Sequence, residues 1–257
     1  GRHQGLDLVE EGRQPLHQTL SVNAEVVYDA TRFARLASRA PGVIKRVYKS
    51  VGDAVQGGEV LASVDSSALG AAKATLLAAA ATVRLWEKNH AREQDLWQRG
   101  VATEREALET ETKVVECRIE LARARQHLTN LGLSDSQVEQ TLADEDASSL
   151  LALAAPFDGL VVERTATVGE VVDTTTTLLA VADTTKMWAL LDLSQAQLPQ
   201  VQAGQAVVLV IDGLRGESFA GRIVSINSEA EPRTRVIKAR AEIDNPDGLL
   251  RANSFGR

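Results

Sequence analysis

Few side chains in this 257-residue sequence have the chemistry to bind a metal ion or to attack a substrate. The sequence has four histidines, one cysteine and one methionine: His3, His17, His90, His127, Cys117 and Met187. Copper and silver favour thiolate and thioether ligands, whereas zinc, cobalt, nickel and cadmium suit imidazole and carboxylate ligands. The composition therefore favours Zn, Co, Cd or Ni over Cu or Ag as any metal that this chain handles, and no bound cofactor is expected.

The two N-terminal histidines are the first candidates for a metal site. His3 and His17 have carboxylates between them at Asp7 and Glu10, but this spacing matches no established ligand motif. We predict that both histidines are ordinary surface residues, and we assign no metal ligands.

Motifs for covalent or phosphate chemistry are absent from the sequence. It contains no Ser/His/Asp order, no glycine-rich phosphate loop and no paired acidic motif, so we do not expect an enzyme. The net charge is −7 and there is no basic run, which argues against nucleic acid as a partner. One cysteine cannot form an intrachain disulfide. We also see no apolar run that approaches the roughly 18 residues needed to cross a bilayer.

Residues 66–149 are expected to be helical, because they contain no proline and are rich in strong helix formers. Mostly apolar residues recur every seven positions before and after the linker "RGVAT". The rows before it are Leu69, Leu76, Val83, His90 and Trp97, with Ala72, Ala79 and Trp86; the rows after it are Ala107, Val114, Leu121 and Leu128, with Thr110, Cys117, Ala124 and Leu131. The pattern predicts an antiparallel coiled-coil hairpin. Gly132 is expected to end its second helix, and Ser134 to cap a short third one.

This hairpin limits the chemistry of the residues within it. Cys117 lies in a core row, so we expect a buried structural thiol and no nucleophile. His90 would face the region of Thr112, and His127 that of Thr75, which places the two histidines several turns apart. A shared metal is therefore excluded, and His90 is expected to be a polar interruption that fixes register.

Two similar β-rich segments flank the helical region. "APGVIKRVYKSVGDAVQGGEVL" begins at Ala40 and "APFDGLVVERTATVGEVVDTTTTLL" at Ala155; their equivalent residues are 117 positions apart without a gap. Gly52 and Gly169 stand at one such pair, where a tight turn with positive φ is expected. Neither half can bury its apolar face alone, so we predict that the two halves pack face to face as a small sandwich.

A barrel-sandwich of two homologous halves is similar to biotinyl and lipoyl carrier domains. With a coiled-coil insertion between its halves, it resembles the periplasmic adaptor (membrane fusion) proteins of tripartite efflux systems. The segments "FDG", "VADTTKMW" and "FAGRIVSINSEAEPRTRVIKARAEIDNPDGLLR" strengthen this resemblance, which covers about residues 17–257. They are most similar to the heavy-metal branch, which works with pumps of the resistance-nodulation-division (RND) type.

The resemblance implies a mainly β fold with an α-helical hairpin, elongated and built from several domains. Residues 1–36 and 184–257 would form a β-barrel, and residues 37–65 and 150–183 the two halves of a lipoyl-like barrel-sandwich. Residues 66–149 would form the hairpin. Family members continue into a membrane-proximal domain, so we expect that this sequence is part of a longer mature protein.

One motif of these adaptors lies at the hairpin tip that meets the outer-membrane channel: Arg, then Leu four residues on, then Ser seven further. Arg92, Leu96 and Thr103 have this spacing here, with Thr in place of Ser. Arginine could form bidentate hydrogen bonds to the channel and leucine an apolar anchor. Alternatively, Arg92 is a solvated charge and Thr103 only a helix cap with Glu106 as its partner.

The resemblance implies a non-enzymatic periplasmic adaptor, anchored to the inner membrane. Its partners would be an inner-membrane RND-type pump, an outer-membrane channel and further copies of itself in a ring, and its cargo divalent heavy-metal cations. Two alternatives stay open: an adaptor for drug efflux or type I protein secretion, and a biotinyl- or lipoyl-type carrier domain. The carrier would need a modifiable lysine where the halves join, but the sequence has the helical insert there.

Overall fold

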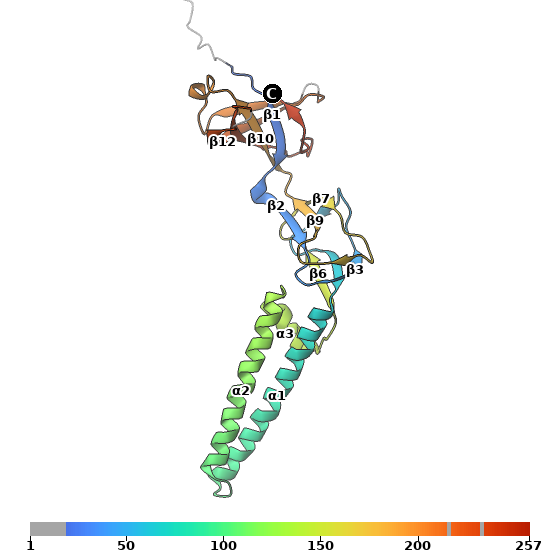
Figure 1. Cartoon of the computed structure of the whole chain (residues 1–257), viewed down its shortest axis with the longest axis vertical. Coiled ribbons are helices and arrows are strands. Elements are labelled where there is room, and N and C mark those ends of the chain that lie inside the picture. Colours follow the sequence, from blue (N-terminus) through green and yellow to red (C-terminus); the bar gives the residue numbers. More distant parts are fainter. Residues whose placement is uncertain (1–18, 215–216, 232–233) are drawn as a thin grey trace, which may run out of the picture. The chain divides into compact units, whose positions relative to one another are not determined.

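The computed structural model describes residues 19–214, 217–231 and 234–257 (Figure 1). His3, His17, Asp7 and Glu10 lie outside the described residues. The described chain divides into two compact units, residues 28–184 and residues 19–27 with 185–257.

The unit of residues 28–184 contains two four-stranded antiparallel sheets and a helical hairpin (Figure 1). The first sheet has the strand order β2 (Phe33–Ala37), β9 (Thr177–Ala182), β7 (Gly159–Arg164), β4 (Ala54–Val55). The second has the order β6 (Leu150–Ala154), β5 (Val60–Asp65), β3 (Gly42–Val47), β8 (Val171–Val172). Buried side chains from both sheets, among them Ile44, Leu61, Val161 and Leu178, share one core.

The two halves of the repeat exchange a strand, which corrects the expectation that each half forms its own layer. β4 of the first half pairs with β7 of the second, and β8 of the second half pairs with β3 of the first. The registers are equivalent, with Gly42 opposite Val172 and Gly159 opposite Val55. The alternating pattern predicts which face of each strand is buried, but it does not select the sheet that a two-residue strand joins.

The turns of the repeat are equivalent too. Gly52 and Gly169 have φ of +96° and +88°, as predicted. The Gly52 N–H donates to the Val161 carbonyl and the Gly169 N–H to the Ile44 carbonyl, each at 2.9 Å. Each turn is therefore fixed by the opposite half, which relates the halves by an approximate twofold.

The strand that precedes the repeat belongs to the sandwich. β2 pairs with β9 along its length, from Phe33 opposite Ala182 to Ala37 opposite Thr177. The expected boundary between residues 36 and 37 therefore falls inside a strand and is wrong by several residues. β2 lies outside the repeated segment, so the repeat gave no signal for it.

The hairpin consists of α1 (Ser67–Gln98) and α2 (Glu104–Asn130), which run antiparallel, followed by the short α3 (Asp135–Asp144) (Figure 1). Gly132 has φ of +97° after the end of α2, and Ser134 caps α3 in a capping box with Gln137, both as predicted. The core of the sandwich continues into the base of the hairpin through Leu69, Ala72, Leu76, Ala124 and Leu128.

Half of the sixteen predicted seam residues are buried and seven more are partly buried, with three corrections. Trp97 is 41% exposed and lies at the end of α1, which finishes one residue later. Cys117 is only partly buried and lines a groove between α1 and α2 beside Trp86. His90 Nδ1 lies 3.1 Å from the hydroxyl of Thr110, two residues nearer the tip than Thr112, the centre of the region that it was expected to face.

Helix α1 is also long and apolar enough to cross a membrane by length and composition alone, contrary to our reading of the sequence. Its alanines raise the hydropathy of a segment whose Leu69, Leu76 and Val83 are buried within the protein. In this structure α1 is one arm of the hairpin.

The second unit is a six-stranded antiparallel barrel. Its strand order is β11 (Ala206–Val210), β12 (Ser218–Ala230), β13 (Ile237–Asp244), β10 (Lys186–Leu193), β1 (Ala24–Tyr28), β14 (Phe255–Gly256). A bridge between Ile211 and Gly256 joins the two outer strands of the sheet. Alternate residues of β10 and β13 are buried inside, as expected for strands with one face toward a core.

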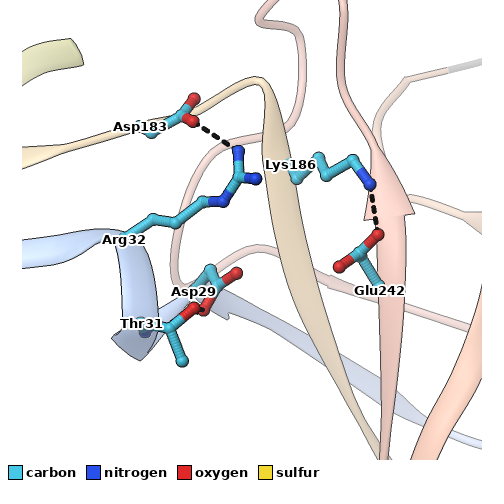
Figure 2. Close-up of polar contacts among 6 residues, drawn as sticks. All are labelled: Asp29, Thr31, Arg32, Asp183, Lys186 and Glu242. Carbon is cyan, nitrogen blue, oxygen red and sulfur yellow. Dashed lines mark hydrogen bonds and ion pairs between the residues drawn. The ribbon is translucent and has the colours of Figure 1, made fainter. Parts of the chain in front are cut away.

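Short polar contacts fix the ends of the strands in each unit (Figure 2). In the sandwich unit, Asp29 accepts from the N–H and hydroxyl of Thr31 and caps the 3-10 turn η1 (Ala30–Arg32), while Arg32 pairs with Asp183 at 2.7 Å. In the barrel, Lys186 of β10 pairs with Glu242 of β13.

Candidate docking surface at the hairpin tip

The turn at the end of the hairpin is short and well hydrogen-bonded. The Leu96 carbonyl accepts the N–H groups of Val101 and Ala102, at 2.9 and 3.2 Å. Gly100 has φ of +76°, a conformation that favours glycine, and its N–H donates to the Trp97 carbonyl at 2.9 Å. The turn therefore leaves Val101 at its outer end, with 75% of the residue exposed.

Thr103 starts α2 as part of a capping box. Its N–H and hydroxyl both donate to Glu106 Oε2 at 2.8 Å, and the Glu106 N–H donates back to the hydroxyl at 3.3 Å. The backbone and side-chain hydrogen bonds from Thr103 lower the pKa of Glu106. The capping role of Thr103 is confirmed, and its role in docking stays a prediction.

Replacing Thr103 with alanine is expected to loosen the tip by about 1 kcal/mol, because the first turn of α2 loses its cap. Hydrogen exchange of the Glu106 amide should become faster, whereas Thr103→Ser should keep the wild-type rate. Because the pKa of Glu106 is lowered, its charged hydrogen bonds with Thr103 stabilise the tip at neutral pH. This stabilisation is lost as the pH falls through the pKa of Glu106. Equal exchange rates in the alanine and serine variants would contradict this account.

Arg92 and Leu96 lie one turn apart on α1, as their spacing predicts. The Arg92 side chain is 66% exposed and is 3.6 Å from Glu93, so little of it is engaged within the chain. Leu96 is half-buried. Arg92 also borders a shallow groove between the helices, which is lined by Trp86, Asn89, Arg92, Glu93, Glu106, Glu109, Thr110, Thr112 and Lys113.

Our sequence reasoning missed two apolar residues at the tip. The sequence pattern predicts Trp97 in the seam and Val101 in the linker, yet they are 41% and 75% exposed. The available signal was position: Trp97 is the last residue of its seven-residue row, where no further turn of α2 can cover it. With Leu96 they give the tip an apolar centre, and exposed tryptophan is typical of binding hot spots.

Charged side chains surround this apolar centre. Arg99 pairs with Asp95 at 3.0 Å and Arg105 with Glu109 at 2.8 Å, and both guanidinium groups remain largely exposed. These exposed pairs contribute little to stability but can exchange partners with a docking protein. We name Arg92, Leu96, Trp97, Val101 and Thr103 the tip surface.

The tip surface combines an exposed guanidinium with exposed apolar side chains. Within the described residues, no group of three or more His, Cys, Asp or Glu side chains could hold a metal ion. His90 is a poor ligand candidate, because its Nδ1 contacts a threonine hydroxyl in the seam.

Comparisons with known proteins agree with this architecture. Residues 32–183 match the family described as "CzcB-like, barrel-sandwich hybrid domain", and residues 186–257 match "CusB-like, beta-barrel domain". The chain belongs to the CzcB-like membrane fusion proteins. The resemblance to the heavy-metal branch is thereby confirmed. This is a family of non-enzymatic periplasmic adaptors.

Several curated relatives of this membrane fusion protein have names from metal resistance, and another is named "Macrolide export protein MacA". The chain is 28% identical over 232 residues to "Cobalt-zinc-cadmium resistance protein CzcB" of Cupriavidus metallidurans, covering 90% of this chain and 43% of the relative. It is 28% identical over 221 residues to "Nickel-cobalt-cadmium resistance protein NccB" of Alcaligenes xylosoxydans xylosoxydans, covering 84% and 52%. The chain thus spans about half the length of these relatives.

A solved structure supports the fold. The crystal structure of ZneB from Cupriavidus metallidurans is 26% identical and superposes with a TM-score of 0.62, covering 91% of this chain and 94% of that one. The prediction of a β-rich protein with barrel-sandwich and β-barrel domains is therefore confirmed, and the structure contains the helical hairpin.

Proposed function

We propose that this membrane fusion protein links an inner-membrane RND-type pump to an outer-membrane channel and serves the export of divalent heavy-metal cations. The names of the two metal-resistance relatives support this cargo, because they mention cobalt, zinc, cadmium and nickel. The chain's own residues argue against copper or silver: Met187 is fully buried and Cys117 is the only thiol.

The observation that carries the docking role is the tip surface. It combines an exposed guanidinium at Arg92 with an apolar centre at Leu96, Trp97 and Val101. A carbonyl or carboxylate of the channel would accept from Arg92, and an apolar pocket would take Trp97 and Val101. Thr103 holds the geometry of the tip through its cap.

One hairpin presents one tip, so a channel opening would be met by several copies arranged in a ring. In this arrangement α1 and α2 form a coiled-coil hairpin that extends toward the channel. The full-length protein would act in the periplasm and be anchored to the inner membrane.

Two other functions remain as alternatives. Drug efflux or type I protein secretion would use the same fold with a different cargo. A biotinyl or lipoyl carrier is disfavoured by the structure, because the helices α1, α2 and α3 occupy the connection between β5 and β6, where a carrier presents its lysine on a tight turn.

The test is metal tolerance of cells that contain the full-length protein with its pump and channel. Arg92→Asp should abolish tolerance to the exported metal, because it puts a repulsive charge at the contact. Arg84→Asp is the matched control: it lies on the same helix and its side chain is 65% exposed, against 66% for Arg92. We expect the control to keep wild-type tolerance to zinc, cobalt, cadmium and nickel.

Other outcomes would count against the proposal. If both variants were expressed and equally tolerant, Arg92 would have no role in docking. If the wild type protected against drugs but no metal, the adaptor role would stand and the cargo would be wrong.

A further inference from the structure

Strand β6 forms one edge of the second sheet of the sandwich. In an antiparallel pair, only every second residue of an edge strand hydrogen-bonds to the neighbouring strand. The Ser66 N–H donates to the Ser149 carbonyl at 2.8 Å, and the Ala155 N–H donates to the Glu59 carbonyl at 2.9 Å. Ser149 and Ala155 therefore turn their backbone groups toward β5 and the residues beside it. By the same alternation, three residues turn their N–H and C=O groups away from β5: Leu150, Ala152 and Ala154.

This edge lacks the protection that the other sheet edges of the described chain have. β6 contains no charged side chain and no proline, and its three outward-turned residues are exposed. By contrast, edge strand β2 has the exposed Arg35, β4 and β8 have two residues each, and a bridge joins the outer strands of the barrel. Charges and very short strands commonly prevent an edge from pairing with another chain. β6 therefore offers three backbone units to an added strand.

A cavity of about 280 Å³ lies beside this edge, within the same unit. β6 contributes Leu150, Leu151 and Ala152 to its lining, and two of these are outward-turned residues. The lining from α1, α3 and the turns beside α3 includes Leu69, Lys73, Leu133 and Asp144. Leu69 and Leu151 belong to one core, so the cavity is on the core side of β6. An engineered cavity of about 150 Å³ holds benzene, so this larger one has room for one long side chain.

The cavity has one carboxylate in excess. Lys73 is paired with Asp146 at 2.6 Å, and these two charges cancel. Asp144 is exposed and forms no ion pair within the described part of the chain. Leu69 and Leu133 add buried apolar surface to the same lining. This combination favours a side chain with an apolar stem and a cationic head, which lysine and arginine have.

We propose that β6 binds an extended basic segment of a partner protein, which adds a strand to the sheet. Such strand addition takes its affinity from main-chain hydrogen bonds and its specificity from pockets for alternate side chains. The segment pairs with the outward-turned backbone groups of β6. One of its lysine or arginine side chains enters the cavity, with the stem along Leu69 and Leu133 and the head at Asp144. The site is on the sandwich, so it is separate from the tip surface and does not depend on metal export.

The test is amide hydrogen exchange, followed by NMR, of the purified protein with the peptide acetyl-Thr-Val-Lys-Val-Thr-amide. Without peptide, the Ala152 amide should exchange fast and the Leu151 and Leu153 amides slowly, because only the latter two bond to β5. Saturating peptide should slow exchange at Ala152 by at least about tenfold. A peptide with glutamate in place of lysine should bind about fivefold more weakly, because its charge is repelled by Asp144.

Two pairs of variants locate the site. Ala152→Pro removes an outward N–H and keeps the ladder with β5, since proline is tolerated where the N–H of an edge strand faces solvent. It should weaken peptide binding by at least about tenfold, whereas Ala152→Ser, which keeps the N–H, should bind as the wild type does. Asp144→Asn should reduce the preference for lysine over glutamate. Asp135→Asn, on the same helix but outside the cavity lining, should keep that preference.

Unchanged exchange at Ala152 with saturating peptide would overturn the proposal, as would equal peptide binding by a folded Ala152→Pro variant. If Ala152→Pro does not fold, the exchange measurement on the wild type still decides. Slower exchange at higher protein concentration, without peptide, would assign the edge to a second copy of this chain and refute a separate partner. Equal binding of the lysine and glutamate peptides would refute the basic character of the segment.

Discussion

Asp146→Ala is expected to destabilise the sandwich-hairpin unit by about 2 kcal/mol, whereas Lys73→Met should cost under about 1 kcal/mol. Lys73 lies on α1 at the base of the hairpin, where only 7% of its side chain is exposed. Its ammonium group donates to Asp146 at 2.6 Å and to the Ser148 hydroxyl at 3.2 Å. Removing the carboxylate leaves a buried charge with one neutral partner.

Lys73→Met should destabilise the protein less than Asp146→Ala, because Asp146 is more exposed than Lys73. Asp146 has 43% of its side chain exposed, so after Lys73→Met its carboxylate is solvated by water. This exposure also keeps our value for Asp146→Ala below the 3–5 kcal/mol of a fully buried pair. Methionine has a length similar to lysine and fills the same space. The double variant should therefore recover most of the stability lost in Asp146→Ala.

The pH dependence gives an independent check. The hydrogen bonds from Lys73 and the Ser148 N–H lower the pKa of Asp146 to about 2, from its usual 3.8. A lowered pKa stabilises the folded state above the usual value, and this contribution is lost as the pH falls through about 2. Thermal unfolding followed by circular dichroism should show a constant difference between wild type and Asp146→Ala near neutral pH, which shrinks in this acidic range. Equal stability of Asp146→Ala and Lys73→Met would contradict the account.

The contact between Lys73 and Asp146 could not be predicted from the sequence, although the helix and its buried face could. Lys73 stands in an alanine-rich run that predicts a helix, and the row of Leu69 and Leu76 predicts the buried face. Its partner is 73 residues away, and no local pattern connects them. The buried lysine was therefore missed, although the helix that carries it was predicted.

Patterns that repeat along the chain were predicted well. The spacing of 117 residues predicted the two equivalent halves, and the seven-residue rows predicted both helices of the hairpin. The assignment of β4 and β8 to the opposite sheets could not be predicted, because two-residue strands have too few side chains to indicate a partner. At the tip, the spacing of Thr103 and Glu106 predicted the capping box, whereas the exposure of Trp97 depends on where the neighbouring chain turns.

The other large effect is expected at the paired glycines of the repeat. An added Cβ at Gly42 would lie 2.4 Å from the Asp65 carbonyl oxygen, and one at Gly159 would lie 2.5 Å from the Ala182 carbonyl oxygen. Both contacts are to backbone of a paired strand, which cannot move without losing ladder hydrogen bonds. Gly42→Ala and Gly159→Ala should each lower the free energy of unfolding by about 2–3 kcal/mol. Gly57→Ala is the control, because its nearest atom is at 3.4 Å, and it should be nearly neutral.

Because the halves exchange strands, each of these variants should destabilise both halves. Gly42 is opposite Val172 of the second half, and Gly159 is opposite Val55 of the first. Strain at either glycine therefore weakens a sheet to which both halves contribute, and neither half can unfold while the other keeps its full set of pairs. Chemical denaturation of each variant should show one transition for the two sheets, at similarly lowered denaturant concentrations. Separate transitions, or a cost at Gly42 no greater than that at Gly57, would mean that the halves are stable independently of the exchanged strands.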